Sequence, residues 1–242
     1  MRKTITFLLL FILSTSLFTC KKTAGTQVFY LNGNFIGVRK SGAIKFYESN
    51  GQKIWKYSAN KDFKGDGPID GVFYFNGSYI GIRHGRFVKF YKTDKSGKWG
   101  YSPGKDFTSP IGVDGMFALN GNPLGVWQGK TIKFFDTNAA GAWSASPIKD
   151  FVADNNIDGA FHISTTYMGV REGRRVKFYL LNGQRDNWMH ITSIDFISPT
   201  DADDMFCLSS GAVGVVKGST VKFYSINRQN KWAYNPGSDF NF

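Results

Sequence analysis

Short apolar runs separated by turn residues follow one another along most of this chain. Within residues 69–107 the runs cover 72–75, 79–83, 87–91 and 99–101, and Gly, Asn, Asp and Ser lie between them. The runs are rich in β-branched and aromatic side chains, which is typical of strands in an all-β protein. No long window shows helical periodicity after the N-terminal segment. The pattern therefore predicts a four-stranded antiparallel meander in this stretch.

The same pattern occurs five times. A Lys-Phe-Tyr or Lys-Phe-Phe element recurs at spacings of 44, 44, 44 and 45 residues, beginning at Lys45, Lys89, Lys133, Lys177 and Lys222. Each copy has a central glycine before this element, at Gly37, Gly81, Gly125, Gly169 and Gly214. Each copy ends in Asp-Phe, at Asp62, Asp106, Asp150, Asp195 and Asp239. A fixed period of this length is the signature of a solenoid or a propeller.

Both faces of each predicted meander are apolar. Ile44 and Phe46 point to one side of their strand and Tyr47 points to the other, because side chains alternate along a strand. A radial arrangement of blades buries both faces and protects the edges. The terminal copies look like the inner ones, whereas an open solenoid needs atypical capping repeats. We therefore expect an all-β, five-bladed β-propeller of four-stranded blades over residues 28–242.

Residues 1–19 read as a signal peptide. Arg2 and Lys3 precede an apolar run over residues 5–13, which is too short for a membrane-spanning helix. The four residues 17–20 resemble a bacterial lipobox, which would make Cys20 the lipidated first residue of the mature protein and residues 20–27 its tether. The alternative is ordinary cleavage that leaves Cys20 as a thiol. We expect an exported protein, anchored through lipid to a membrane of a bacterial cell envelope.

The charge pattern argues against a nucleic-acid partner. The whole chain has a net charge of +12, and loss of residues 1–19 removes two basic and no acidic side chains, which leaves +10. The basic residues are spread over all copies without a long block, so they favour solubility and weak attraction to anionic surfaces. After Cys20 the only cysteine is Cys207, so the mature chain has no intrachain disulfide. We expect a monomer.

Two known families resemble the repeat. Asp186-Asn187-Trp188, Gly169-Val170 and Lys177-Phe178-Tyr179 are similar to the repeat of the tachylectin-2-like lectins. That resemblance implies a five-bladed propeller with an N-acetylglucosamine pocket.

The second resemblance is to hemopexin-like repeats, on the Ile-Asp-Gly-x-Phe sequences at 69–73 and 157–161 and on residues 81–91. It implies a protein-interaction or matrix-interaction module with an ion in the axial channel. Hemopexin-like domains have four blades closed by a disulfide, whereas this chain has five copies.

Aromatic and basic residues supply the candidate ligand groups. A Trp stands at one fixed position in each copy, and an aromatic face can stack on a sugar ring, so we predict repeated sugar sites at Trp55, Trp99, Trp143, Trp188 and Trp232. The alternative is that these Trp side chains fill space between blades. Where the copies differ, at residues 39, 83, 127, 171 and 216, a unique site is predicted at Trp127 flanked by Arg83 and Arg171.

Acidic side chains supply a candidate metal site. Four aspartates precede the predicted innermost strands and could ring the axis around Ca²⁺: Asp70, Asp114, Asp158 and Asp203. The alternative is that each forms an Asx turn leading into its strand.

Catalysis has little support in the sequence. The three histidines fall at different phases of the repeat, only two glutamates occur, and no His-Glu-x-x-His or Gly-x-Ser-x-Gly motif is present. We therefore expect a non-enzymatic, multivalent, lectin-like protein that binds glycans. The alternative is a hemopexin-like module that binds a surface or extracellular protein, and a glycan-acting hydrolase with an Asp pair is a remote one.

Overall fold

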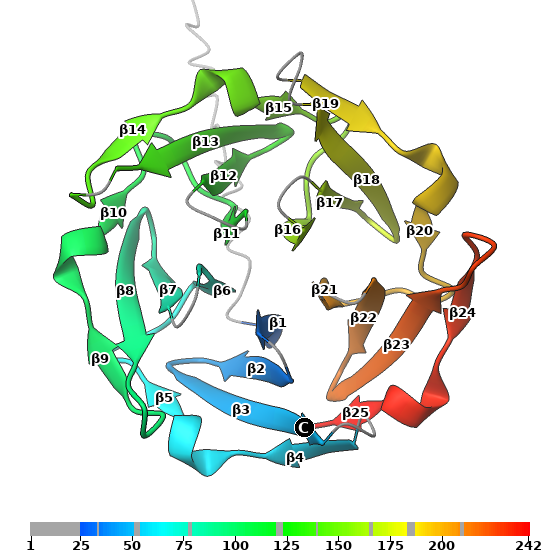
Figure 1. The fold of residues 1–242 in the computed structure, drawn as a ribbon, viewed down its shortest axis with the longest axis horizontal. Helices are drawn as coiled ribbons and strands as arrows, with labels where there is room; N and C mark the ends of the chain where they lie inside the picture. The colour runs from blue at the N-terminus through cyan, green and yellow to red at the C-terminus, as the bar shows by residue number, and fades with distance from the viewer. Residues whose placement is uncertain are drawn as a thin grey trace, which may run out of the picture.

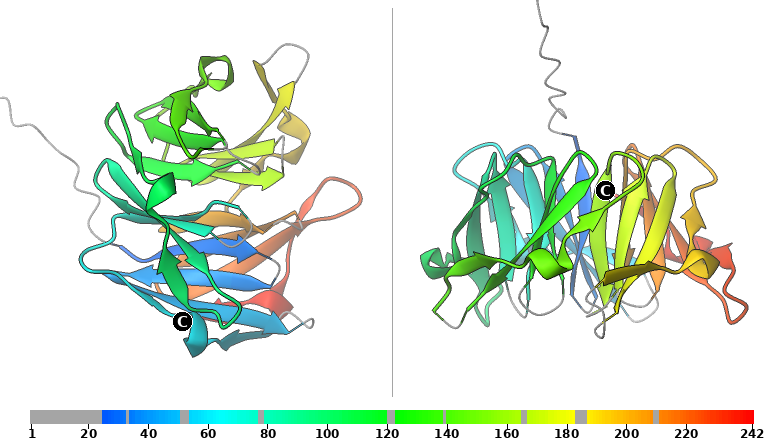
Figure 2. Two further views of the ribbon diagram at one scale, coloured as in Figure 1. Left: turned by 60° about the vertical axis from the view of Figure 1, so that its left-hand side comes forward. Right: turned by 90° about the horizontal axis from the view of Figure 1, so that it is seen from above.

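Five antiparallel sheets surround a central axis and confirm the predicted five-bladed β-propeller (Figure 1). The computed structural model describes residues 25–32, 34–50, 54–76, 79–119, 123–138, 140–164, 167–182, 187–208 and 211–242. Over these ranges the chain forms no α-helix. Seen from the side, the blades make a thick disc with connecting turns on both faces (Figure 2).

Each blade is a contiguous stretch of the chain whose strands run in order from the axis to the rim. The innermost strands are β1 (Gln27–Asn32), β6 (Gly71–Tyr74), β11 (Gly115–Ala118), β16 (Gly159–Ser164) and β21 (Asp204–Leu208). The second strands are β2 (Phe35–Lys40), β7 (Tyr79–His84), β12 (Leu124–Gln128), β17 (Tyr167–Glu172) and β22 (Ala212–Lys217). The third strands are β3 (Ala43–Asn50), β8 (Phe87–Thr93), β13 (Thr131–Thr137), β18 (Arg175–Asn182) and β23 (Thr220–Ile226). The rim strands are β4 (Ile54–Tyr57), β9 (Trp99–Tyr101), β14 (Trp143–Ala145), β19 (Asn187–His190) and β24 (Trp232–Tyr234).

A turn and a fifth, two-residue strand complete each blade and were not predicted from the sequence. The single 3₁₀ turns after the rim strands are Ala59–Lys61, Pro103–Lys105, Pro147–Lys149, Thr192–Ile194 and Pro236–Ser238. The short strands pair with the third strand of the same blade and are β5 (Phe63–Lys64), β10 (Phe107–Thr108), β15 (Phe151–Val152), β20 (Phe196–Ile197) and β25 (Phe240–Asn241). We number the blades 1 to 5 in chain order and call the contact between neighbouring blades a seam.

The ring closes by packing and not by exchange of a strand. Each innermost strand contacts the innermost strands of both neighbours, and β1 contacts β21 where the first blade meets the last. Apolar clusters lie in the seams. Phe29 and Ile44 of blade 1, for example, pack in one cluster with Val72 and Ile80 of blade 2. Burial of a side chain of this size contributes about 1.5–3 kcal/mol.

The central glycine of each repeat accommodates a phenylalanine ring. Gly81 pairs with Phe73 across β6 and β7, and a Cβ atom at Gly81 would lie 2.3 Å from Cζ of that ring. The other four copies repeat this arrangement with contacts of 2.3–2.5 Å, in the pairs Gly37/Phe29, Gly125/Phe117, Gly169/Phe161 and Gly214/Phe206. A side chain at this position would displace the ring, which explains why the repeat has glycine there.

Candidate functional site

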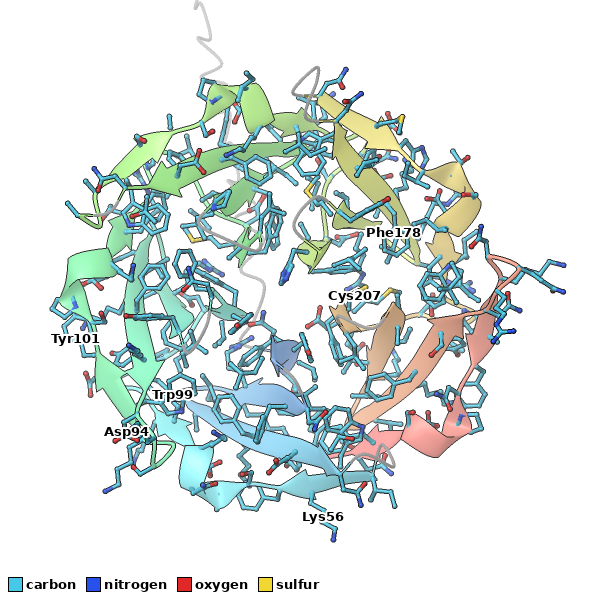
Figure 3. All side chains as sticks on the ribbon, in the orientation of Figure 1. Lys56, Asp94, Trp99, Tyr101, Phe178 and Cys207 are labelled. Atoms are coloured by element: carbon cyan, nitrogen blue, oxygen red, sulfur yellow. The ribbon has the colours of Figure 1, made fainter. Side chains whose placement is uncertain are left out.

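The five repeated tryptophans join neighbouring blades. Each indole N–H donates to the backbone carbonyl that ends the 3₁₀ turn of the preceding blade. The pairs are Trp55 to Ser238 at 3.2 Å, Trp99 to Lys61 at 2.7 Å, Trp143 to Lys105 at 2.9 Å, Trp188 to Lys149 at 2.7 Å and Trp232 to Ile194 at 3.0 Å. The first of these bonds links blade 1 to blade 5 and helps to close the ring. Figure 3 shows Trp99 at the seam between blades 1 and 2.

The indole rings are also stacked in the seams. Trp99 stacks on Phe46 of blade 1 with ring centroids 5.5 Å apart, and the other four Trp side chains stack on the corresponding Phe at 5.7–6.0 Å. One face and the N–H of each indole are therefore used in the scaffold. The space-filling alternative describes this position well, and the sugar-stacking role of the five Trp side chains stays a prediction.

The four aspartates of the predicted axial ion site bond within their own blades. Each carboxylate accepts from the backbone N–H of the glycine in the turn between the second and third strands. The pairs are Asp70 with Gly85 at 2.6 Å, Asp114 with Gly129 at 2.7 Å, Asp158 with Gly173 at 2.7 Å and Asp203 with Gly218 at 2.8 Å. Over the described ranges no three His, Cys, Asp or Glu side chains lie together as a metal site. In this structure each carboxylate braces a turn, as the Asx-turn alternative expects, and the axial Ca²⁺ site stays a prediction.

The position where the copies differ lies at one end of the axis, opposite the first residue of each innermost strand. Arg39 donates to the carbonyl of Ile69 in blade 2 at 2.7 Å, and Arg171 donates to the carbonyl of Ala202 in blade 5 at 2.7 Å. Trp127 is 8% exposed and packs in the cluster between blades 3 and 4. Arg83 bonds carbonyls of its own blade. Trp127 and Arg171 thus contact the following blade, whereas the bonds of Arg83 stay within its own blade, and the unique site at these three residues stays a prediction.

The axis contains a cavity of about 1050 Å³. The innermost strands of all five blades line it, and Phe29, Phe73 and Phe117 contribute aromatic surface beside the polar groups of Arg39 and Arg83. The turn residues Gly129 and Gly218 also line it. Desolvation by burial lowers the pKa of both arginines from the ordinary value, and nearby carboxylates, Asp204 for Arg39 and Asp70 for Arg83, partly oppose this effect.

The rim repeats a pairing of a ring with the aspartate of Asp-Phe. Tyr101 donates its hydroxyl to Asp106, and the same bond joins Tyr57 to Asp62 and Tyr234 to Asp239. The pKa of Tyr101 is raised to about 12, mainly by this hydrogen bond and secondly by desolvation. The lysines of blades 1, 2 and 5 lie over these Tyr rings, 5.5–5.7 Å from the centroids. The side chains of Lys45, Lys89 and Lys222 therefore pack on rings of their own blade.

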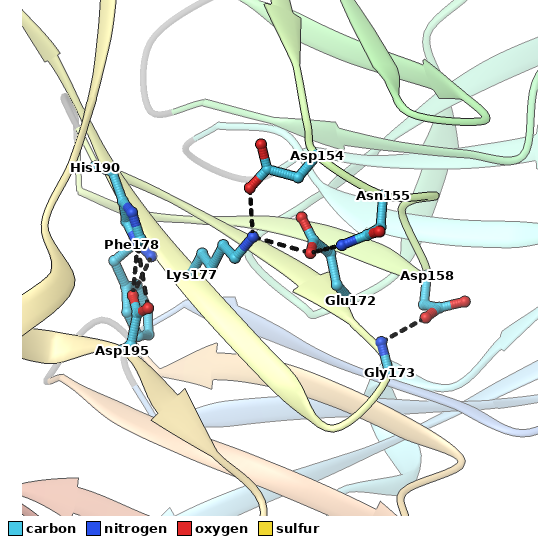
Figure 4. Close-up of polar contacts among 9 residues, drawn as sticks. All are labelled: Asp154, Asn155, Asp158, Glu172, Gly173, Lys177, Phe178, His190 and Asp195. Carbon is cyan, nitrogen blue, oxygen red and sulfur yellow. Dashed lines mark hydrogen bonds and ion pairs between the residues drawn. The ribbon is translucent and has the colours of Figure 1, made fainter.

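Blade 4 departs from this rim pattern (Figure 4). His190 replaces the tyrosine, bonds Asp195 at 2.9 Å and stacks on Tyr179 at 5.1 Å. Lys177 is 7% exposed and donates to Asp154 of the preceding connection at 2.7 Å and to Glu172 at 3.0 Å. The hydrogen bond that Lys177 donates to Asp154 is the main reason why the pKa of Lys177 is raised, and the same bond lowers the pKa of Asp154.

A pocket of about 390 Å³ opens at the rim of the seam between blades 3 and 4. Rings of this seam line it together with carboxylates and an amide, in the set Asp150, Phe151, Val152, Asp154, Tyr179, Asn187, Trp188 and His190. Lys133 pairs with Asp150 at 2.5 Å and Lys177 pairs with Asp154, so a cation partners each acid of the pocket. The pocket therefore combines aromatic surface with hydrogen-bonding groups and little uncompensated charge.

Of the predicted site residues, only Trp188 lines this pocket, while Arg83, Trp127, Asp70, Asp114, Asp158 and Asp203 line the axial cavity. Sequence reasoning missed His190, Asn187, Asp154 and Glu172. Three of the other copies have Tyr at the place of His190, so this departure from the repeat was a usable signal. Cys20 lies outside the described residues.

Comparison with known proteins leaves the function open. No family model and no curated protein matches the chain. A protein of unknown function from Desulfotomaculum acetoxidans is 12% identical, with a TM-score of 0.49 over 88% of this chain and 69% of that one. A protein from Lactobacillus plantarum is 12% identical, with a TM-score of 0.46 over 85% and 68%. A candidate 6-phosphogluconolactonase from Bacteroides uniformis is 11% identical, with a TM-score of 0.46 over 88% and 70%. Likenesses this distant carry no argument about activity.

Proposed function

We propose that this is an exported, non-enzymatic protein that binds carbohydrate in the rim pocket between blades 3 and 4. The observation that carries the proposal is the lining of that pocket, where Trp188 and His190 lie beside Asp150, Asp154 and Asn187. Sugar rings offer an apolar face to aromatic side chains and hydroxyl groups to carboxylates and amides. The volume of about 390 Å³ falls within the range of small-molecule sites.

The charge balance of the pocket favours a neutral sugar. Lys133 and Lys177 hold Asp150 and Asp154 in ion pairs at 2.5 and 2.7 Å, so these acids can accept from hydroxyl groups while their charges are partly compensated. A free carboxylate pair would instead favour a cation. The resemblance to tachylectin-2-like lectins points to the same class of ligand.

The lining of the pocket favours one sugar site per protein and not the five equal sites that the repeat predicted. The residues at the place of Asn187 are Ile, Lys, Ala and Lys in the other blades. The set of His190, Asn187 and Asp154 therefore does not recur in the other copies. We therefore propose one principal site and no ring of five equal sites. High avidity would then require several anchored copies on one surface, which is where a lipidated Cys20 would contribute. Among the described residues no helix is long and apolar enough to cross a membrane.

A glycan array probed with the mature protein tests the proposal. We expect neutral glycans to bind, Asn187→Ala and Asp154→Asn to weaken binding at least tenfold, and millimolar free sugar to compete. Lys98→Ala is the matched control, because Lys98 precedes Trp99 in blade 2 as Asn187 precedes Trp188, and it should leave binding unchanged. A blank array, or binding that both pocket variants retain in full, would reject this function.

A further inference from the structure

The innermost strands have backbone groups that face the axis. Each of these strands is an edge strand of its sheet, so it pairs on one side only. Alternate residues of such a strand direct their N–H and C=O away from the sheet. In β6 these include Val72, which lines the axial cavity together with its counterparts Met116 in β11 and Ala160 in β16.

A glutamine side chain occupies one of these backbone edges. Nε2 of Gln27 in blade 1 donates to the carbonyl of Val72 at 2.9 Å, and Oε1 accepts from the N–H of Val72 at 3.0 Å. The primary amide of Gln27 thus uses its donor and acceptor on one residue of the next blade. In the seam between blades 5 and 1, Asp204 accepts in a similar way from the N–H of Val28 at 3.4 Å.

Glycine replaces the glutamine in the next three seams. Gly71, Gly115 and Gly159 stand at the register of Gln27, opposite Arg83, Trp127 and Arg171 as Gln27 stands opposite Arg39. Glycine has no side chain to send to the next blade, so over the described ranges Met116 receives no amide like the one that Val72 receives. Buried backbone N–H and C=O groups generally have partners, from the protein or from ordered water.

A flat group lies beside Gly71 in the same cavity that Met116 lines. A Cβ atom placed on Gly71 would lie 3.0 Å from Nε of Arg83, so the guanidinium of Arg83 lies where a side chain of residue 71 would begin. Nε of Arg83 is not among its bonds, since its two terminal nitrogens donate to Gly85 and Asp70. A planar guanidinium stacks on flat rings.

We propose that the axial cavity binds a small ring with a cis-amide edge, such as a lactam or a pyrimidinone, on the backbone N–H and C=O of Met116. Such a ring presents N–H and C=O on the same side, as the primary amide of Gln27 does. A trans peptide amide points them in opposite directions and cannot bond both groups of one residue. The site is independent of the rim pocket.

Two-dimensional NMR of the ¹⁵N-labelled mature protein, titrated with uracil and δ-valerolactam, tests the site. We expect both probes to shift the amide signal of Met116, and N-methylacetamide, whose amide is trans, to leave it unshifted at equal concentration. Gly71→Gln introduces at residue 71 the side chain that blade 1 has at Gln27, and it should abolish the shift of the Met116 signal. Gly71→Ala should retain that shift.

The reverse variant keeps the test open if Gly71→Gln does not fold. Gln27→Gly removes the built-in amide and should make the Val72 signal respond to the same two probes. The site is rejected if neither cyclic amide shifts Met116, if N-methylacetamide shifts it equally, or if Val72 fails to respond in a folded Gln27→Gly variant.

Discussion

The close contact between Gly81 and the ring of Phe73 predicts how much one added methyl group at residue 81 destabilises the protein. In Gly81→Ala the new Cβ would lie 2.3 Å from Cζ of Phe73, whereas carbon atoms in contact are normally about 3.5–4.0 Å apart. The ring must therefore move by more than about 1 Å, yet it is 5% exposed and lies edge-on to Phe90 at 6.1 Å. We expect a loss of about 1–3 kcal/mol, which is the usual cost of overpacking a core.

Chemical denaturation with tryptophan fluorescence measures this loss as a lower midpoint at unchanged slope. Gly104→Ala is the matched control, because a Cβ there meets no atom within 4 Å, and it should stay within about 0.5 kcal/mol of the parent. In a Phe73→Leu background the smaller side chain leaves room for the methyl group, so Gly81→Ala should cost at least about 0.5 kcal/mol less there. The reasoning is refuted if Gly81→Ala is as stable as the parent, or if its cost is the same with Phe73 and with Leu at residue 73.

Four further predictions follow from the seams, the rim and the N-terminus. Trp99→Phe keeps the stacking ring but removes the donor to Lys61, so the free energy of unfolding should fall by about 0.5–1.5 kcal/mol, and an unchanged value in denaturation would contradict the structural role of the indole. Tyr101, with its raised pKa, contributes stability that is present below pH 10 and is lost between pH 10 and about 12; Asp106→Asn should lower that pKa in an ultraviolet titration, and no shift would show that the bond does not form. If the axial carboxylates only brace turns, chelator should leave the melting temperature unchanged, and a fall that Ca²⁺ reverses would refute this account and support the predicted ion site. Cys20→Ala should release the protein from membranes in cell fractionation, and retention would reject the lipid anchor.

The number and kind of structural units followed from the sequence. Five near-equal spacings required five equivalent units, and runs that are apolar on both faces required each sheet to be covered on both sides. The strand bounds were also accessible, since the predicted run 79–83 became β7 (Tyr79–His84) and the run 99–101 became β9 (Trp99–Tyr101). These features depend on local alternation and on turn chemistry, which neighbouring residues decide.

Only the closed ring decided what each repeated side chain touches. The indole of Trp55 bonds Ser238, 183 residues away, and the indoles of the other blades bond carbonyls 38 or 39 residues away, so no local pattern reveals their partners. The same holds for the amide of Gln27 on Val72. The repeat makes all copies look equivalent, but a seam joins two different copies, and its chemistry depends on both. That is why the rim pocket beside His190 and the open edge at Met116 became visible only when the blades were placed side by side.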